Sequence, residues 1–315
     1  MKKILFYTVI IIVAALFIEF GSWSIIKIYQ STTQPKTNIN YKKVVLENES
    51  KNDYHEYYAF YGWKKKDIVS KNINVKNYLR KTKKNLNWDK KSKIWFFGGS
   101  TMWGSSVSDI NTIPSLSSDL NHSFQPINFG EGGYNSGQAL NRLIEVIDDV
   151  QEGDHVVFFD GVNDAYINCN SLNGPNGTGQ VRHIRRLIKK DQNFFKGLYI
   201  ETIVQFKKTN SFVLLNAIGK RLGLEDDHFK NYACNKTEYA FEVAENLVRH
   251  WKVAETIAKN RKANFVCILQ PNPYTANFKV NQGIRKVYKQ STLDVYPKIK
   301  KLAKSLECYN DLTDL

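Results

Sequence analysis

The chain has 315 residues, 42% of them hydrophobic, and carries a formal net charge of +15. This length and composition exclude global disorder and allow one main domain of roughly 200 to 250 residues with attachments. The excess of lysine comes without a recognisable nucleic-acid-binding motif, so we expect no nucleic-acid partner; compositional drift explains the charge most simply, and attraction to an anionic membrane surface or an acidic glycan is the alternative.

Residues 1–30 form a predicted membrane anchor. Two lysines precede an apolar run at residues 4–26, which is long enough to cross about 30 Å of hydrocarbon as a helix. The lysines favour a cytoplasmic N-terminus, so we expect a single-pass protein of the cytoplasmic membrane whose body is exported to the periplasmic or extracellular side. A cleaved signal peptide is the alternative, but no small-residue cleavage site closely follows the apolar run.

Residues 31–93 separate the anchor from the main domain. The part up to Asp53 is polar and typical of a linker. An aromatic run follows, from Tyr57 to Trp63, whose rings we expect to pack against the core, with stacking on a glycan as the alternative. From Lys64 to Lys93 the chain is basic, and we expect irregular structure there.

Residues 94–315 show short apolar runs that alternate with longer segments of helical period. We predict strands at residues 94–97, 127–129, 155–159, 264–269 and 309–312. We predict helices at residues 113–120 with Pro114 in the first turn, after a cap at Ser136, at residues 237–259, and around a core of residues 297–306. Strands joined by helices of this length predict right-handed crossovers, and therefore a three-layer α/β/α sandwich of flavodoxin-like type with a mainly parallel sheet.

An insertion at residues 165–236 interrupts this alternation after the third strand. Open α/β sheets bind ligands at the carboxyl ends of their strands, which is where this insertion emerges. We therefore expect either a lid or cradle for a substrate, or an excursion with a purely structural role.

The four cysteines lie far apart in the sequence and include no C-x-x-C pair, so we expect neither a zinc site nor a thiol redox site. Export would allow disulfides. Of the three pairings we favour Cys169 with Cys234, which would join the ends of the insertion, and Cys267 with Cys308 at neighbouring strands. Buried free thiols are the alternative.

A glycine pair and a serine, Gly98-Gly99-Ser100, follow the first predicted strand. The glycines allow a tight turn that leaves the Ser100 hydroxyl at the start of a helix, where free amides favour developing negative charge. Taken alone, this motif is equally typical of a plain strand-to-helix turn. Two later segments follow strands at the same sheet edge: one offers the amide of Gly133, and the other offers the side-chain amide of Asn163.

Together these blocks resemble those of the SGNH hydrolases, also called GDSL esterases and lipases. The nucleophile block of that family reads approximately F-G-D-S-L-T-x-G, and residues 97–104 match it with Gly99 in place of the aspartate, a G-G-S variant familiar among exported, polysaccharide-associated members. The resemblance runs from Ile94 to the C-terminus, outside the insertion. It implies that Ser100 is the nucleophile and the first oxyanion donor, that Gly133 is the second donor through its N–H, and that Asn163 is the third through its side chain.

The base of this family lies in a D-x-x-H block shortly after the last strand, where the aspartate orients the histidine that takes the serine proton. No histidine follows His250, while Asp311 and Asp314 stand where the chain approaches such a block. The catalytic base is therefore unknown, and we expect the sequence to be truncated before the block. An inactive member, or recruitment of His228 from the insertion, is the alternative.

The resemblance implies serine-dependent acyl transfer on O-acyl groups, O-acetyl above all, of cell-surface or exported carbohydrate or on a small ester, without a metal or an organic cofactor. Hydrolysis and transfer to a sugar hydroxyl share one covalent intermediate, so both stay open. A catalytically inactive SGNH-fold protein that binds glycan or a partner protein of the cell envelope is the alternative.

Overall fold

The structure is a computed structural model that describes residues 2–33, 55–85, 88, 92–120, 122–181, 199, 202–203, 205–221, 229, 231–275 and 286–313. The chain divides into two compact units: residues 1–39 with 183–230 form the first unit, and residues 40–182 with 231–315 form the second. The second unit carries the sheet and is called the body below.

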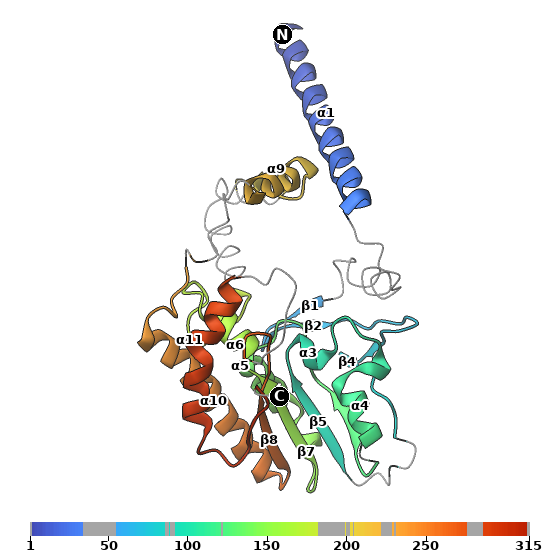
Figure 1. Cartoon of the computed structure of the whole chain (residues 1–315). Helices are drawn as coiled ribbons and strands as arrows, with labels where there is room; N and C mark the ends of the chain where they lie inside the picture. Colours follow the sequence, from blue (N-terminus) through green and yellow to red (C-terminus); the bar gives the residue numbers. More distant parts are fainter. Residues whose placement is uncertain are drawn as a thin grey trace. The chain divides into compact units, whose positions relative to one another are not determined.

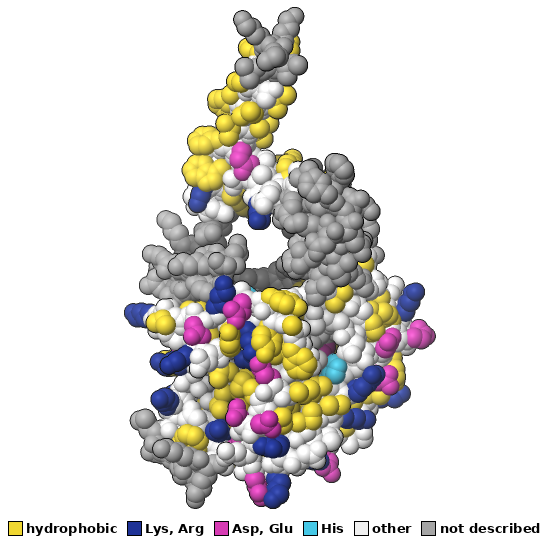
Figure 2. Space-filling model, turned by 180° about the vertical axis from the view of Figure 1, so that it is seen from behind, with side chains coloured by type: hydrophobic (Ala, Val, Ile, Leu, Met, Phe, Trp, Pro, Cys, Tyr) yellow, Lys and Arg dark blue, Asp and Glu magenta, His cyan; other side chains and the backbone are white. Residues whose placement is uncertain are grey.

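The first unit contains two described helices, α1 (Lys2–Thr33) and α9 (Asn210–Arg221). Within α1, the stretch Phe6–Ser31 has a mean hydropathy of 2.3 and the length of a membrane span. Hydrophobic side chains cover this helix in the space-filling view, whereas charged side chains are spread over the body (Figure 2). The predicted apolar helix is confirmed, and a signal sequence near an N-terminus shares its length and composition.

A seven-stranded sheet forms the centre of the body, in the order β3-β4-β6-β5-β7-β8-β9 (Figure 1). Five neighbouring strands are parallel: β6 (Gln125–Asn128), β5 (Lys93–Gly98), β7 (His155–Asp160), β8 (Asn264–Leu269) and β9 (Tyr309–Asp311). The predicted mainly parallel sheet is confirmed. Each of the five predicted strands matches one of these strands to within two residues at either end.

Helices cover both faces of the sheet. The described helices of the body are α3 (Ser100–Trp103), α4 (Ile113–Leu120), α5 (Ser136–Val146), α6 (Val162–Asn168), α10 (Thr237–Asn260) and α11 (Lys286–Ala303), with short 3-10 turns η1 (Asp109–Asn111) and η2 (Ile147–Asp149).

Residues of opposite parity along the strands enter two separate cores. Phe97 and Phe158 lie in the larger core with side chains of α5, α10 and α11, which follow one another along that face. Phe96 and Phe159 lie on the opposite face with Met102 of α3. This alternation follows from the two-residue period of a strand, and it gives the predicted three-layer α/β/α sandwich.

The described part of the flank from His55 to Arg80 is structured, so the expectation of irregular structure is wrong for residues 64–80. Strands β1 (His55–Tyr58) and β2 (Gly62–Lys65) form an antiparallel hairpin. Strands β3 (Val75–Lys76) and β4 (Leu79–Arg80) extend the main sheet, with β4 antiparallel to β6. A small core holds this segment, because Ile68, Ile73 and Val75 pack with Trp103.

Two helix starts differ from the sequence prediction. Asn135, rather than Ser136, caps α5: its side chain accepts a hydrogen bond from the Gln138 amide at 3.2 Å, and the Gln138 side chain accepts one from the Asn135 amide at 3.3 Å. Helix α11 begins eleven residues before Pro297, which lies inside it. Burial of Val295 and Ile299 along one face stabilises the helix across a proline that removes one backbone hydrogen bond.

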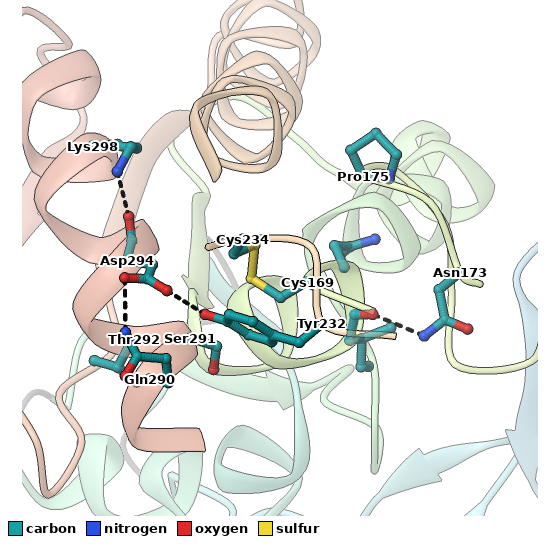
Figure 3. The surroundings of a disulfide bond; sticks show 12 residues. Cys169, Asn173, Pro175, Tyr232, Cys234, Gln290, Ser291, Thr292, Asp294 and Lys298 are labelled. Atoms are coloured by element: carbon teal, nitrogen blue, oxygen red, sulfur yellow. Dashed lines mark hydrogen bonds between the residues drawn. A yellow bond between two sulfur atoms is a disulfide. The ribbon is translucent and has the colours of Figure 1, made fainter. Parts of the chain in front are cut away.

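Two disulfides have the pairing that the sequence favours. Cys169 pairs with Cys234, and Cys267 of β8 pairs with Cys308, with Cα atoms 5.1 and 5.2 Å apart. Beside the first disulfide, the Tyr232 hydroxyl donates to the Asp294 carboxylate of α11 at 2.5 Å (Figure 3). The two ends of the insertion are therefore joined covalently at the point where the chain enters and leaves the body.

Candidate active site

Ser100 is the first residue of α3 and directly follows β5, with Gly99 as the N-cap. Its side chain is half-buried, and among the described residues no group hydrogen-bonds its hydroxyl. Its carbonyl oxygen accepts hydrogen bonds from the amides of Gly104 at 3.0 Å and Ser105 at 2.9 Å. The turn therefore fixes the backbone of Ser100 and leaves the hydroxyl available.

Glycines bring the turn after β5 against the neighbouring strands. Gly98 has φ +152°, and a Cβ atom there would lie 2.5 Å from the Phe159 carbonyl oxygen of β7. A Cβ atom on Gly130, just after β6, would overlap with the backbone amide of Trp103 in α3. The Glu131 amide donates to the Gly98 carbonyl at 3.0 Å, so the segments after β5 and β6 are held together.

Asn163, the second residue of α6, lies directly beside this turn. Its Nδ2 donates to the Tyr134 carbonyl at 2.7 Å. A Cβ atom on residue 99 would lie 2.5 Å from the same nitrogen and 3.2 Å from the Tyr134 carbonyl oxygen. The Asn163 amide therefore occupies the space into which a side chain at position 99 would project.

Gly133 lies in the loop after β6, immediately before Tyr134, with φ +81°. The hairpin β1–β2 holds this loop. Trp63 Nε1 donates to the Gly132 carbonyl at 3.1 Å, the Tyr134 hydroxyl donates to the Trp63 carbonyl, and a Cβ atom on Gly133 would lie 3.3 Å from the indole ring. The sequence analysis did not place Trp63 at this loop; its only signal was the aromatic run.

Glu131 is a buried carboxylate at the start of the same loop. It accepts hydrogen bonds from the Gly132 amide at 2.8 Å and the Lys65 amide at 3.0 Å. Its Oε1 lies 3.5 Å from His55 Nε2 and 3.9 Å from Lys65 Nζ. His55 is thus a histidine that contacts the loop carrying Gly133, a position that its place in the sequence did not indicate.

A second buried group of polar side chains fixes α6. Asp164 accepts hydrogen bonds from the Ser136 amide at 3.0 Å, the Ser136 hydroxyl at 2.5 Å and the Gly161 amide at 3.2 Å. The same hydroxyl lies 2.8 Å from His250 Nδ1. Burial lowers the pKa of His250. The pKa of Asp160 is raised by its own burial and by the neighbouring Asp164 carboxylate. These contacts hold α6 against α5 and α10. They therefore position Asn163, the residue that precedes Asp164 in α6.

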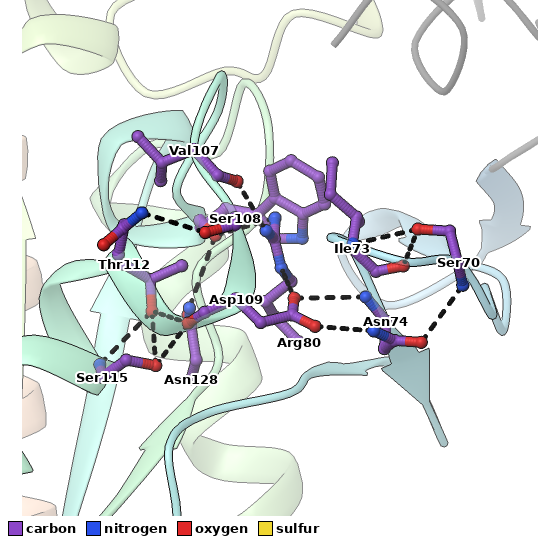
Figure 4. A network of polar contacts seen from close by, with 12 residues as sticks. Ser70, Ile73, Asn74, Arg80, Val107, Ser108, Asp109, Thr112, Ser115 and Asn128 are labelled. Carbon is purple, nitrogen blue, oxygen red and sulfur yellow. Dashed lines mark hydrogen bonds and ion pairs between the residues drawn. The ribbon is translucent and has the colours of Figure 1, made fainter. Parts of the chain in front are cut away.

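Another buried network, formed between β4 and the segment after α3, holds the other side of the Ser100 turn (Figure 4). The Arg80 guanidinium donates to Asp109 Oδ1 at 2.6 Å and to the Val107 carbonyl at 2.8 Å. It also lies 4.3 Å from the centre of the Trp103 ring. The Asn74 side chain completes this network around Arg80 by donating to Asp109 Oδ2 at 2.8 Å.

The structure places the remaining candidates for the base as follows. His155 begins β7 and His122 precedes β6, so both lie toward the amino ends of the strands, opposite Ser100. His183, His228 and Asp314 lie outside the described residues.

Asp311 of β9 is engaged elsewhere. Although burial raises the pKa of this carboxyl, hydrogen bonds from Thr313 and the nearby Lys300 ammonium hold it below its usual value. The base therefore has no assigned residue in the described part of the chain. Within that part, the acidic, histidine and cysteine side chains also form no group of three that could hold a metal ion.

The serine, glycine and asparagine blocks follow β5, β6 and β7 of the parallel sheet, which is the arrangement that the resemblance to the SGNH/GDSL hydrolases implies.

The chain is similar to three solved structures. The first is a member of the lipolytic G-D-S-L family from Veillonella parvula, at 11% identity over 70% of this chain and 77% of that chain, with a TM-score of 0.37. The second is an extracellular lipase from Streptomyces rimosus, at 13% identity over 70% and 80%, with a TM-score of 0.37. The third is an acetylxylan esterase from Geobacillus stearothermophilus, at 11% identity over 71% and 77%, with a TM-score of 0.34. No family model matches the chain, and no curated protein matches its sequence.

Proposed function

We propose that the body transfers acyl groups from esters through a covalent intermediate on Ser100. The observation that supports this most directly is the position of Asn163, whose amide lies beside the turn that carries the serine. The Gly133 loop meets the same turn through Tyr134. Three donors would then face a developing oxyanion: the amides of Ser100 and Gly133 and the Asn163 side chain. Loss of one such donor typically costs about 2.7 to 4 kcal/mol of transition-state stabilisation.

The reaction proceeds in two steps. The Ser100 oxygen attacks the ester carbonyl and passes its proton to a base, and the resulting oxyanion is held by the three donors. Collapse of this intermediate breaks the ester bond, so the alcohol leaves with the proton and the acyl group stays on Ser100. Water or a sugar hydroxyl then takes the acyl group by the same steps. The residue that serves as base is not assigned.

The substrate class we propose is O-acyl groups, above all O-acetyl, on cell-surface or exported carbohydrate. The hairpin that holds the Gly133 loop supports this choice, because Tyr57 and Phe60 on it expose 72% and 51% of their surface. Exposed aromatic rings offer flat apolar surfaces for sugar rings. We make no assignment between hydrolysis and transfer to a hydroxyl.

We also propose that α1 anchors the protein in the cytoplasmic membrane with its body exported. Lys2 and Lys3 before the span favour a cytoplasmic N-terminus, and two disulfides fit an oxidising compartment. Protease added to intact spheroplasts is expected to digest the body. Full protection of the body, with digestion only after lysis, would reverse the topology.

A non-catalytic role is the second candidate, and one observation favours it: no described group hydrogen-bonds the Ser100 hydroxyl. In that case the same edge would bind acylated glycan, or a partner protein of the cell envelope, without turnover. The two candidates differ in whether Ser100 reacts.

The test is hydrolysis of p-nitrophenyl acetate by the purified full chain, with and without imidazole, against Ser100→Ala. A positioned base contributes about 10² to 10⁴-fold to such reactions, and free imidazole can supply part of this where the base is missing. We expect the wild-type chain with imidazole to exceed Ser100→Ala with imidazole by about tenfold or more. Equal rates for the two proteins at every imidazole concentration would support the non-catalytic role.

A further inference from the structure

Glu19, a carboxylate within the apolar stretch of α1, binds the N-terminus of α9. Its Oε1 accepts hydrogen bonds from the Asn210 amide at 2.5 Å and side chain at 2.8 Å, and its Oε2 accepts from the Ser211 amide at 3.0 Å and hydroxyl at 2.9 Å. A helix N-terminus offers free amides and a positive dipole end, which favour a carboxylate. The only acidic residue of the predicted anchor thus has four donors from one helix of the insertion.

The position of Glu19 along the span indicates where α9 lies. The span Phe6–Ser31 places Glu19 near its middle, 13 residues after Phe6 and 12 residues before Ser31. An unpaired carboxylate at that depth is costly, whereas one that is fully hydrogen-bonded is tolerated. Ser22, one turn further along the same face of α1, is buried to 7% exposure.

The stretch Asn210–Gly219 of α9 is a short apolar helix, in which Asn216 is an exposed polar side chain. Val213, Leu215 and Ile218 expose 48%, 62% and 44% of their surface, while Phe212 and Leu214 are half-buried. A helix that is apolar on several sides is typical of burial in a core or in lipid, rather than of exposure to water. Its 12 residues extend over about 18 Å, which is too short to cross a bilayer.

We infer that α9 is a second membrane-attached element, which lies in the leaflet on the exported side of the bilayer and is held there by Glu19. Its partner is the lipid itself, whose acyl chains contact Val213, Leu215 and Ile218. The insertion is then neither a lid nor a mere excursion, but a membrane attachment. This inference is independent of the reaction at Ser100 and rests on the proposal that α1 spans the membrane with the body exported.

Depth-dependent fluorescence tests the inference in the full chain. Ile218→Cys and, separately, Val213→Cys are labelled with an environment-sensitive fluorophore and reconstituted into phosphatidylcholine vesicles with brominated acyl chains. Asp148→Cys is the matched control, because that side chain is 99% exposed on the body. We expect blue-shifted emission and several-fold stronger quenching at both α9 positions than at position 148. Emission and quenching equal to the control at both positions would overturn the inference.

The role of Glu19 is tested with Glu19→Ala in the Ile218→Cys background. Loss of the four hydrogen bonds is expected to reduce the quenching at position 218. A label at Phe17→Cys, within α1 itself, is expected to stay quenched and so reports that the anchor still inserts. Unchanged quenching at position 218 in Glu19→Ala would refute the anchoring role of this carboxylate.

Discussion

Asn163 and Gly99 form one functional pair at the residue scale. A primary amide carries two N–H groups, and one of those of Asn163 is used by the Tyr134 carbonyl. This bond orients the side chain and leaves the second N–H for an oxyanion. The arrangement requires that residue 99 has no side chain, because a Cβ atom would take the place of the amide nitrogen.

Gly99→Ala is therefore expected to reduce Ser100-dependent acyl transfer as strongly as Asn163→Ala, by about 10² to 10³-fold in kcat. The added methyl group displaces the Asn163 amide, so the oxyanion loses the same hydrogen-bond donor as in Asn163→Ala. The double variant should be no worse than either single variant, since both remove one interaction. Steady-state kinetics on an acetyl ester measure all three.

Gly132→Ala is the matched control, because a Cβ atom on that residue would meet nothing within 4 Å. Its activity should stay near that of the wild type, with thermal unfolding reporting that all variants are folded. An active Gly99→Ala variant, or additive losses in the double variant, would show that Asn163 is not positioned as we describe.

The sequence alone predicted that Ser100, Gly133 and Asn163 lie at one edge of the sheet, because each follows an apolar strand and the strand ends of a parallel sheet share an edge. Trp63, Glu131 and His55 could not be predicted. They meet through contacts between the N-terminal hairpin and the loop after β6. A hydrophobic pattern along the sequence does not indicate contacts between such distant segments.

At the scale of elements, a buried ion pair joins β4 to the segment that follows α3. Arg80 has a side-chain exposure of 0% and Asp109 one of 10%. Removing one partner of such a pair leaves a buried charge without compensation, which is costlier than losing an exposed pair. This contact therefore holds the N-terminal flank to the element that carries Ser100.

Asp109→Ala is expected to lower the free energy of unfolding by about 3 to 5 kcal/mol. Asp119→Ala removes the partner of Lys83 in a pair in which both side chains are nearly half exposed, at 46% and 47%. This control should cost no more than about 1 kcal/mol. Denaturant unfolding followed by tryptophan fluorescence compares the two, and equal losses would contradict a buried network at Arg80.

The elements differ in how well the sequence predicts them. The central strands are continuous apolar runs, which indicate burial on both faces, so their positions were predicted closely. Strands β3 and β4 have two residues each, too few to show an alternating pattern. For α11 the sequence predicted only a core of residues 297–306, whereas packing of the apolar face carries the helix across Pro297.

At the scale of the whole molecule, the insertion belongs partly with the N-terminal apolar helix α1. Residues 183–230 form a compact unit with residues 1–39, and Glu19 and Asn210 meet although 191 positions separate them in sequence. Sequence patterns describe neighbours along the chain, so they indicated an insertion without showing what it contacts. The disulfide between Cys169 and Cys234 closes the base of this insertion.

The central claim is that Ser100 is a nucleophile, and acylation of that residue tests it most directly. The full chain is mixed with p-nitrophenyl acetate, quenched with acid at short times, and digested for peptide mass spectrometry. We predict acetyl on Ser100, with much less in Asn163→Ala. Acetyl groups found only on lysines, or equally on the neighbouring Ser105, would contradict the account.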